Sequence, residues 1–139
     1  MDPIVLVVVD DSATCRLIAQ FLTPQGYTVS TACDGLSALA AVERERPALV
    51  ILDVLLPRVD GLTMLMRLRQ DDPRLPIIVV SAAADARTRL AAIPDVPNRE
   101  SIRVLAKPFS LVTLMALVHH LLPSTPQSAA PSEAQGVRR

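Results

Sequence analysis

The sequence lacks an excess of charge of one sign, and it lacks a long hydrophobic run. Lys and Arg together number 14, as do Asp and Glu, so the formal net charge is zero. A neutral chain has no basic face that could hold nucleic acid through counterion release, so we expect no direct nucleic-acid binding. The apolar residues 4–9 form too short a run for a membrane span or a signal-peptide core, and no basic residue precedes them. We therefore expect a cytoplasmic protein without a membrane segment.

The sequence also lacks a cysteine pattern typical of a metal site. Its two cysteines, Cys15 and Cys33, stand in segments that we predict to be helix and strand, and we expect both to be small buried or half-buried residues. The 139 residues suit one domain of ordinary size. Residues 123–139 contain three prolines and almost no large apolar side chain. We predict a folded domain over residues 1–122 and a disordered tail over 123–139.

Strand-like and helix-like segments alternate along the chain. The expected strands are residues 4–9, 27–32, 49–52, 77–80 and 102–106, and the expected helices are residues 13–22, 36–46, 62–70, 85–92 and 111–122. Five consecutive strand and helix units predict an α/β fold with a parallel sheet and helices on both faces. In the last helix, Ser110 is the expected N-cap and Phe109 is expected to pack on Leu114.

The composition of the strands predicts their order. The first, third and fourth read IVLVVV, LVIL and IIVV, which is typical of strands covered on both faces, whereas YTVSTA alternates and IRVLA contains an arginine. The second and fifth strands should therefore be edges. Right-handed crossovers then favour the doubly wound order 2-1-3-4-5, with a crevice at the carboxyl ends of the first and third strands.

Polar residues follow the strands of this expected sheet at one edge. They are Asp10 and Asp11 after the first strand, Asp53 after the third, Ser81 after the fourth and Lys107 after the fifth. Neighbouring strands lie about 4.8 Å apart, so the three carboxylates should crowd together. Two such charges about 5 Å apart repel by about 3 kcal/mol at an effective dielectric constant of about 20. A cation or a bound proton is therefore needed, and the candidates are Mg²⁺, which prefers oxygen ligands, and the Lys107 ammonium group.

These residues lie in five short motifs that occur in a specific order: VVVDDS, LVILDVLLPRVDG, IIVVSA, LAKPF and the helix that follows. In this combination the sequence resembles the receiver domain of two-component response regulators (CheY-like), from residue 4 to about residue 122. The resemblance implies that Asp53 is the phosphoacceptor, which takes a phosphoryl group from a phosphohistidine on a sensor kinase or phosphotransfer protein.

The resemblance also implies roles for the other residues at this edge. Asp10, Asp11, Asp53 and the main-chain carbonyl of Leu55 would bind Mg²⁺. Ser81 would turn toward the phosphoryl group, Lys107 would pair with it, and the bond before Pro108 would be cis. A phosphoacceptor of this kind takes part in its own phosphorylation and dephosphorylation, but it is not an enzyme in the usual sense.

Each residue also has a simpler structural interpretation. Asp11 or Ser12 could cap the first helix, and Asp53, Ser81 and Lys107 could be a solvated carboxylate, a turn residue and a surface charge. Their convergence on one sheet edge favours a site. Three further expectations concern single segments. They are a turn at Asp60 with a helix start at Gly61, where glycine allows a positive φ; His119 and His120 as exposed or rim residues; and Met64 in the core with Met66 at the surface.

Three features depart from the family pattern. Val104 stands three residues before the lysine, where the family usually has Tyr or Phe, and valine has no ring to swing inward. The segment between Ser81 and Lys107 is a few residues longer than usual, and its prolines 94 and 97 should end the fourth helix early. Finally, Leu55 and Ala83 stand two residues after Asp53 and Ser81, at positions whose side chains modulate hydrolysis of the phosphoryl group in the family. Neither side chain can orient an attacking water molecule, which predicts slow self-dephosphorylation.

The sequence is compatible with three functions. The leading hypothesis is a stand-alone phosphoacceptor receiver with output through protein binding, since no second folded domain is expected after residue 122. The second is a receiver-like interaction module that signals without phosphorylation, which Val104 and the altered fourth-helix region favour. A hydrolase with Asp53 as nucleophile is disfavoured, because aspartate-based phosphatases need a second aspartate at the position of Leu55. The sequence leaves the kinase, the output partner, the oligomeric state and the role of the tail open.

Overall fold

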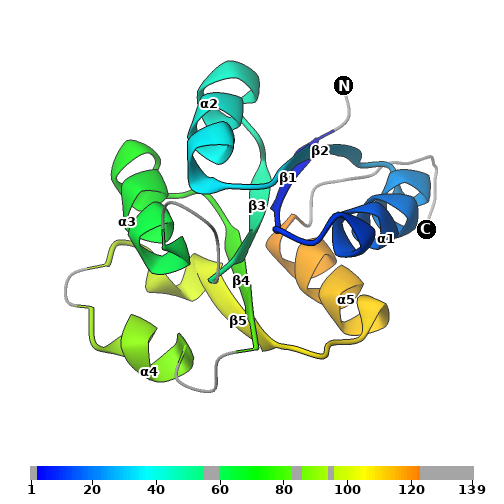
Figure 1. Ribbon diagram of the computed structural model, residues 1–139. Helices are drawn as coiled ribbons and strands as arrows, with labels where there is room; N and C mark the ends of the chain where they lie inside the picture. Colours follow the sequence, from blue (N-terminus) through cyan, green and yellow to red (C-terminus); the bar gives the residue numbers. More distant parts are fainter. Residues whose placement is uncertain (1–2, 55–59, 83–85, 94–95, 123–139) are drawn as a thin grey trace, which may run out of the picture.

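The computed structural model describes residues 3–54, 60–82, 86–93 and 96–122. Its centre is a parallel sheet with the strand order β2-β1-β3-β4-β5 (Figure 1). The strands are β1 (Ile4–Val8), β2 (Thr28–Ala32), β3 (Leu49–Asp53), β4 (Ile77–Ser81) and β5 (Ile102–Ala106). The predicted fold class and strand order are confirmed. The expected tail lies outside the described residues.

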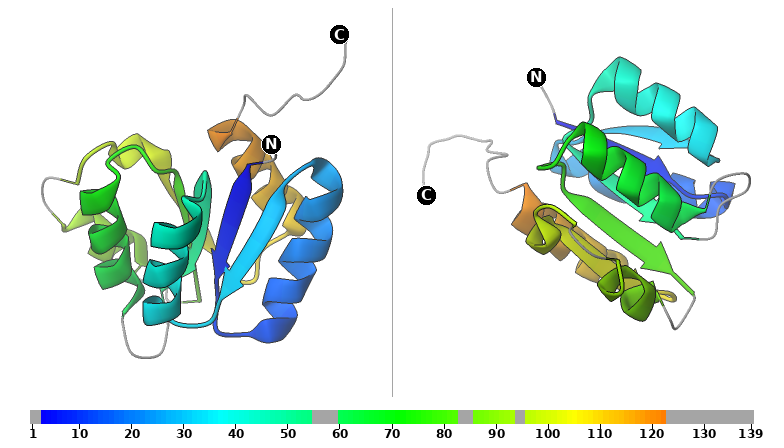
Figure 2. Two further views of the ribbon diagram at one scale, coloured as in Figure 1. Left: turned by 90° about the horizontal axis from the view of Figure 1, so that it is seen from above. Right: turned by 90° about the vertical axis from the view of Figure 1, so that its left-hand side faces the viewer.

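Helices cover both faces of the sheet. They are α1 (Ser12–Leu22), α2 (Gly35–Glu45), α3 (Gly61–Asp71), α4 (Ala86–Ala91) and α5 (Leu111–Leu121), with short 3₁₀ helices at Thr23–Gln25 and Arg99–Ser101. Helices α1 and α5 lie on one side, and α2, α3 and α4 lie on the other (Figures 1 and 2). This arrangement leaves the carboxyl ends of the strands, where the polar residues were expected, at one edge.

Burial separates the strands into two kinds, as the sequence predicts. Every residue of β3 and β4 is buried, and only the first residue of β1 is not. The edge strands β2 and β5 each contain a single buried residue. Because alternate residues of a strand point to opposite faces, the sheet supplies two hydrophobic cores, one under α1 and α5 and one under the other helices.

The helix beginnings follow their capping residues. Asp11, Asp34, Asp60 and Ser110 each accept a hydrogen bond from a backbone N–H in the first turn of the helix that follows. Such caps satisfy donors that have no partner within the helix, and each typically stabilises by about 1 kcal/mol. The expected cap at Ser110 is present, with Phe109 and Leu114 packed in the same hydrophobic core.

Helix α4 is short, and an arginine from a later segment binds carbonyl groups at its carboxyl end. It has six residues and ends at Ala91. The guanidinium group of Arg99 donates to the carbonyl oxygens of Leu90 at 2.9 Å and Ile93 at 2.5 Å. These bonds satisfy carbonyl groups at the end of the helix that a longer helix would have paired internally. Pro94 lies outside the described residues.

Arg69 of α3 is buried, with 1% of its surface exposed. Its guanidinium group donates to the Ser101 hydroxyl at 2.9 Å and to the Asp72 carbonyl oxygen at 3.2 Å. Burial lowers the pKa of Arg69, because removal from water disfavours the charged form. The side chain therefore ties α3 to the segment that leads into β5.

Two expectations about single residues are wrong. Cys33 is exposed, because it follows the last residue of the edge strand β2, whereas Cys15 is buried as expected. Gly61 begins α3 as expected, but it does not have a positive φ, and Gly26 is the glycine of the described residues that does. A side chain at Gly61 would instead collide with the backbone of Asp53 and Val54, so close packing explains this glycine.

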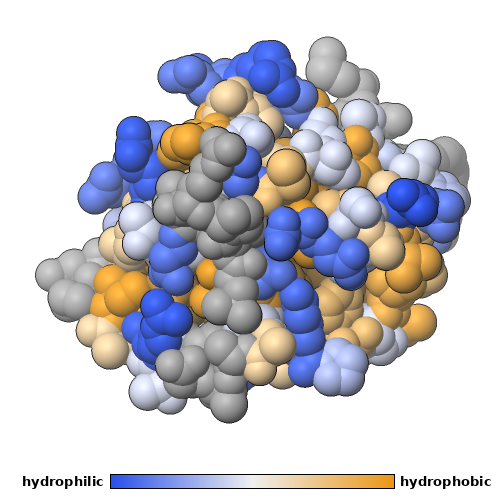
Figure 3. Space-filling view, viewed as in Figure 1, coloured by the Kyte–Doolittle hydropathy of each residue, from blue (hydrophilic) through white to orange (hydrophobic). Residues whose placement is uncertain are grey.

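Met64 is buried and both histidines are exposed, as expected. Met66, expected at the surface, is half-buried and packs against the core. No helix in the described part of the chain is both long enough and apolar enough to span a membrane. Hydrophobic residues gather on the side of the surface where α1 and α5 lie, whereas hydrophilic residues gather over α2 and α3 (Figure 3).

Candidate functional site

The candidate site lies at the carboxyl edge of the sheet, at the ends of β3, β4 and β5. Asp53 is the last residue of β3 and Ser81 the last residue of β4, each one residue beyond the expected strand end. Lys107 follows β5 directly. In the β3–β4 ladder Asp53 pairs with Val80, so Asp53 and Ser81 are near neighbours across adjacent strands.

Asp53 and Lys107 form a short ion pair. The Lys107 ammonium nitrogen lies 2.6 Å from Asp53 Oδ2. The Asp53 side chain is 6% exposed and the Lys107 side chain 28% exposed. A carboxylate that is largely removed from water needs a compensating charge, and the ammonium group provides it. The long lysine side chain can reach Asp53 from β5, although β4 lies between the two strands.

The backbone fixes the position from which Lys107 reaches inward. The Lys107 N–H donates to the Ser81 carbonyl oxygen at 2.8 Å, and the Lys107–Pro108 peptide bond is cis. Ser81 is 1% exposed, so it is buried at the end of β4, the strand next to β3. The structure thus brings Asp53, Ser81 and Lys107 together at one edge.

Asp10 and Asp11 are exposed residues after β1, but Asp11 is engaged as a helix cap. Its Oδ1 accepts from the Ala13 N–H at 3.1 Å and its Oδ2 from the Thr14 hydroxyl at 2.6 Å. The hydrogen bond from the Thr14 hydroxyl, followed by that from the Ala13 N–H, lowers the pKa of the Asp11 carboxyl. The helix-capping interpretation is therefore correct for Asp11.

The expected crowding of three carboxylates is not seen. Among the described residues there is no group of three or more His, Cys, Asp or Glu side chains that could hold a metal ion. The physical reason is that Asp11 turns toward its own helix and Asp53 is neutralised by Lys107. The donors of Asp10, Asp11 and Asp53 are all oxygen atoms, which suits Mg²⁺. Leu55 and Ala83 lie outside the described residues. The family resemblance implied that the Leu55 carbonyl binds the metal and that both positions affect dephosphorylation.

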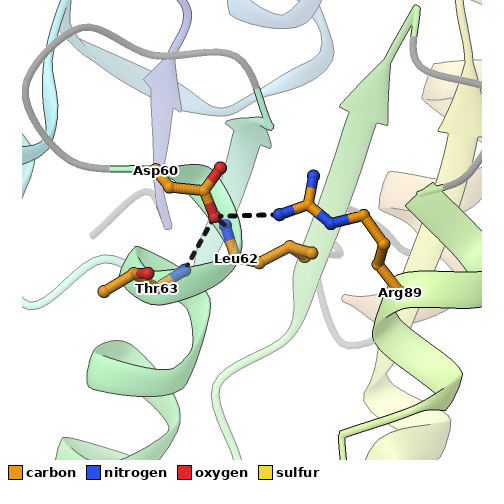
Figure 4. Close-up of polar contacts among 4 residues, drawn as sticks. All are labelled: Asp60, Leu62, Thr63 and Arg89. Carbon is orange, nitrogen blue, oxygen red and sulfur yellow. Dashed lines mark hydrogen bonds and ion pairs between the residues drawn. The ribbon is translucent and has the colours of Figure 1, made fainter.

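Asp60, which was expected only as a turn residue, joins two helices near the site (Figure 4). Its Oδ2 accepts from the N–H groups of Leu62 at 3.0 Å and Thr63 at 3.4 Å, and it lies 3.5 Å from Arg89 Nη2. The carboxylate therefore begins α3 and also contacts α4. The sequence indicated a turn and a helix start here, but neither the capping role of Asp60 nor its partner on α4, 29 residues away, was predicted.

A second arginine of α4 contacts the atypical position on β5. Arg87 Nη2 donates to the Val104 carbonyl oxygen at 3.0 Å, and the Val104 side chain is half-buried. Sequence reasoning missed Arg87, because an arginine on a short exposed helix has no pattern that predicts a backbone acceptor. The contact connects α4 to the edge strand at the position where the family usually has an aromatic ring.

An apolar groove of about 460 Å³ lies next to Lys107, between α1 and the start of α5. Leu17, Ile18, Pro108 and Phe109 are among its lining residues, and Leu17 is 54% exposed. Large exposed apolar side chains that adjoin a groove are typical of binding surfaces. The groove is therefore a candidate contact surface beside the Asp53–Lys107 pair.

Comparison with known proteins agrees with this arrangement. The model of the response regulator receiver domain family matches residues 5–119. The chain is 34% identical over 131 residues to the probable transcriptional regulatory protein TcrX of Mycobacterium tuberculosis, covering 94% of this chain and 54% of the relative. It is 38% identical over 131 residues to the response regulator MprA of Mycobacterium leprae, covering 94% of this chain and 56% of the relative. The chain thus spans about half the length of the curated relatives it matches.

Solved structures show the same fold. The receiver domain of NtrX from Brucella abortus superposes with a TM-score of 0.74 at 32% identity, covering 87% of this chain and 99% of that one. A CheY-like receiver domain protein from Methanospirillum hungatei has a TM-score of 0.78 at 24% identity, covering 88% of this chain and 95% of that one, and supports the fold alone. Because the family model matches most of the chain, the protein belongs to the response regulator receiver domain family of two-component signal transduction.

Proposed function

We propose that the protein is a phosphoacceptor in two-component signalling, with Asp53 as the residue that is phosphorylated. The observation that carries this proposal is the ion pair of 2.6 Å between Lys107 and Asp53 at the end of β3. A lysine that already contacts the carboxylate is placed to contact a phosphoryl group attached to it. The buried Ser81 hydroxyl is a second donor at the same strand ends.

The reaction would transfer a phosphoryl group from a phosphohistidine of a sensor kinase or phosphotransfer protein. A carboxylate oxygen of Asp53 attacks phosphorus, an oxygen–phosphorus bond forms, and the phosphorus–nitrogen bond breaks with its electron pair remaining on the histidine ring. Negative charge is spread over three oxygen atoms during the transfer, and the Lys107 ammonium group would stabilise it. The protein itself supplies positioning and charge, and it is not an enzyme in the usual sense.

Mg²⁺ is the cofactor we propose for this site, with Asp10, Asp11, Asp53 and the Leu55 carbonyl as the candidate ligands. When bound, the ion would neutralise charge on the phosphoryl oxygens. Asp11 is the candidate ligand with a competing role, because both of its oxygens accept hydrogen bonds from the first turn of α1. We therefore expect Mg²⁺ binding to change the environment of Ala13 and Thr14.

The groove beside Lys107 is the surface that we propose for the phosphohistidine-bearing partner. It adjoins Asp53 through Lys107, and its apolar lining includes the exposed Leu17. A Leu17→Asp variant should accept phosphate from a small phosphodonor as the wild type does, but more slowly from a phosphorylated partner. Equal slowing with both donors would mean that the substitution disturbs the site and not the docking surface.

A receiver-like interaction module that does not use phosphorylation is the alternative function. Val104 supports it, because this position has no aromatic ring and its carbonyl oxygen is instead bound by Arg87. In both cases we propose that output is through protein binding, in the cytoplasm and without direct contact to nucleic acid. The relative TcrX is described as a probable transcriptional regulatory protein, so a binding assay with duplex DNA tests the nucleic-acid part of this proposal.

Phosphorylation of the wild type distinguishes the two functions. The protein is incubated with MgCl₂ and acetyl phosphate, and the intact mass is measured. We expect one added phosphoryl group on the wild type and none on Asp53→Ala. Asp71→Asn is the matched control, because Asp71 is an exposed carboxylate at the end of α3, and this variant should be phosphorylated normally. A wild type that gains no phosphoryl mass would overturn the leading proposal in favour of the interaction module.

A further inference from the structure

Cys15 and Cys33 lie at the same edge of the sheet and on the same face. Cys15 is in the first half of α1, which covers the face where Val9 of the sheet and Tyr27 are buried. Ala32, the last residue of β2, packs in the core on the opposite face. Cys33 follows Ala32 directly, and the alternation of the β2 side chains, continued by one residue beyond the strand, assigns Cys33 to the face that α1 covers.

Val9 connects the two cysteines through the backbone. The Cys15 thiol donates to the Val9 carbonyl oxygen at 3.4 Å, and the Val9 N–H donates to the Ala32 carbonyl oxygen at 3.2 Å. Val8 and Ala32 are the last pair of the register, and the Val9 bond to Ala32 continues the ladder by one step, which puts Val9 next to Cys33. Paired residues on adjacent strands are about 5 Å apart. The Cys15 sulfur is therefore bonded to the residue that stands beside Cys33.

The electrostatics of Cys15 agree with this proximity. Burial raises the pKa of the Cys15 thiol most strongly, the hydrogen bond with the Val9 backbone lowers it, and the nearby charges of Asp11 and Cys33 raise it. The two cysteines also differ in access, since Cys33 is exposed and Cys15 is buried. An oxidant in solution would meet Cys33 first, and Cys15 would be the second thiol to react.

We propose that Cys15 and Cys33 form an oxidation site at which a peroxide generates an intramolecular disulfide bond. The Cys33 thiolate attacks one oxygen of hydrogen peroxide, the oxygen–oxygen bond breaks, and Cys33 becomes a sulfenic acid as hydroxide leaves and is protonated to water. The Cys15 thiol then attacks the Cys33 sulfur, the sulfur–oxygen bond breaks, and a second water leaves. In total, two thiols lose two electrons and two protons, and one hydrogen peroxide is reduced to two waters.

The disulfide would connect α1 to the end of β2 beside the candidate phosphorylation site. The first turn of α1 contains the hydrogen bonds that hold Asp11, and Cys15 lies in the next turn of the same helix. A disulfide at Cys15 would restrict the start of α1. It should therefore change how readily Asp11 breaks its hydrogen bonds to Ala13 and Thr14. We therefore expect the oxidised and reduced proteins to be phosphorylated by acetyl phosphate at rates that differ by more than twofold, an effect that rests on the proposed function.

Peptide mapping tests the disulfide directly. The full chain is treated with hydrogen peroxide, free thiols are blocked with an alkylating reagent, and the protein is digested with trypsin without reductant. Cleavage after Arg16 and Arg44 separates the cysteines into the peptides of residues 1–16 and 17–44. We expect these two peptides to be joined, with a mass lower by two hydrogen atoms than their sum, and to separate on reduction. Peptides that are alkylated separately, or a disulfide that joins two copies through Cys33, would overturn the proposal.

Two variants serve as controls. Cys33→Ser changes an exposed residue, so it should fold normally, and its Cys15 should remain alkylatable after unfolding in denaturant at a peroxide dose that oxidises the wild type. Cys15→Ala should leave Cys33 as sulfenic acid or as an intermolecular disulfide. Oxidation of Cys15 at an unchanged rate in Cys33→Ser would contradict the proposed order. If neither redox state is phosphorylated, the proposed function fails while the disulfide is judged by the peptide map alone.

Discussion

Lys107 Nζ lies 2.6 Å from Asp53 Oδ2, so a lysine that follows an edge strand neutralises a carboxylate at the end of the central strand β3. The Asp53 side chain is 6% exposed, so removal of its partner should lower the stability of the folded protein. We expect Lys107→Met to lower the free energy of unfolding by about 1–3 kcal/mol at neutral pH. Urea denaturation of Lys107→Met, Asp53→Asn and the double variant measures the coupling between the two residues. Additive effects would contradict a stabilising ion pair.

Arg69 should contribute to the stability of the fold, although it is a charged residue that is buried in α3. Its buried guanidinium group bonds to Ser101 and to the Asp72 carbonyl, so Arg69→Ala removes these bonds and leaves a cavity. We expect a loss of about 2–4 kcal/mol in the free energy of unfolding. Arg67→Ala is the matched control, because Arg67 is exposed on the same helix, and it should change the stability by less than about 0.5 kcal/mol. Similar effects of the two substitutions would show that Arg69 does not hold the segment before β5.

Asp60 and Arg89 form one ion pair but should contribute unequally. Asp60 accepts two backbone N–H groups at the start of α3, so Asp60→Ala should cost about 1 kcal/mol. The side chains of both residues are more than 40% exposed and the pair distance is 3.5 Å, so Arg89→Ala should cost less than about 0.5 kcal/mol. Thermal or chemical denaturation of the two variants provides the comparison. A larger loss for Arg89→Ala than for Asp60→Ala would mean that the α3–α4 contact matters more than the cap.

Gly61 and Gly26 should respond to alanine for different reasons. A Cβ at Gly61 would collide with the backbone of Asp53 and Val54, so Gly61→Ala should lower the free energy of unfolding by about 3 kcal/mol. Gly26 has a φ of 100° and nothing within 4 Å of an added Cβ, so Gly26→Ala should cost only about 1 kcal/mol from backbone strain. Urea denaturation of both variants is the measurement. An equal or smaller cost at Gly61 would contradict the close-packing explanation.

Loss of phosphate from Asp53 should be slow. Leu55 and Ala83 stand two residues after Asp53 and Ser81, at positions that modulate hydrolysis in this family, and neither side chain can orient a water molecule. After phosphorylation with acetyl phosphate and removal of the donor, the decay of the phosphorylated mass in MgCl₂ gives the rate. A Leu55→Asn variant introduces an amide that can orient a water molecule, so it should lose phosphate faster. Rapid Mg²⁺-dependent decay in the wild type would contradict the prediction.

Much of the fold could be predicted because local signals and burial agree. The apolar runs of β1, β3 and β4 indicated strands covered on both faces, and the mixed sequences of β2 and β5 indicated edges, as the burial of the strands confirms. The strand ends were predicted one residue short at Asp53 and Ser81, because a polar residue that continues a buried strand does not differ in sequence from one that ends it. The two 3₁₀ helices were not predicted.

By itself, the sequence determined the order of the elements, the residues that converge on the carboxyl edge and the local caps at Asp11 and Ser110, because these depend on hydrophobic periodicity and on short-range hydrogen bonds. Only the tertiary structure decided which partner each polar group takes. It paired Lys107 with Asp53, brought Arg89 to Asp60, and brought Arg87 to the Val104 carbonyl oxygen. The physical reason is that a charged side chain has several possible partners within reach, and the packing of distant segments determines which of them lies at hydrogen-bonding distance.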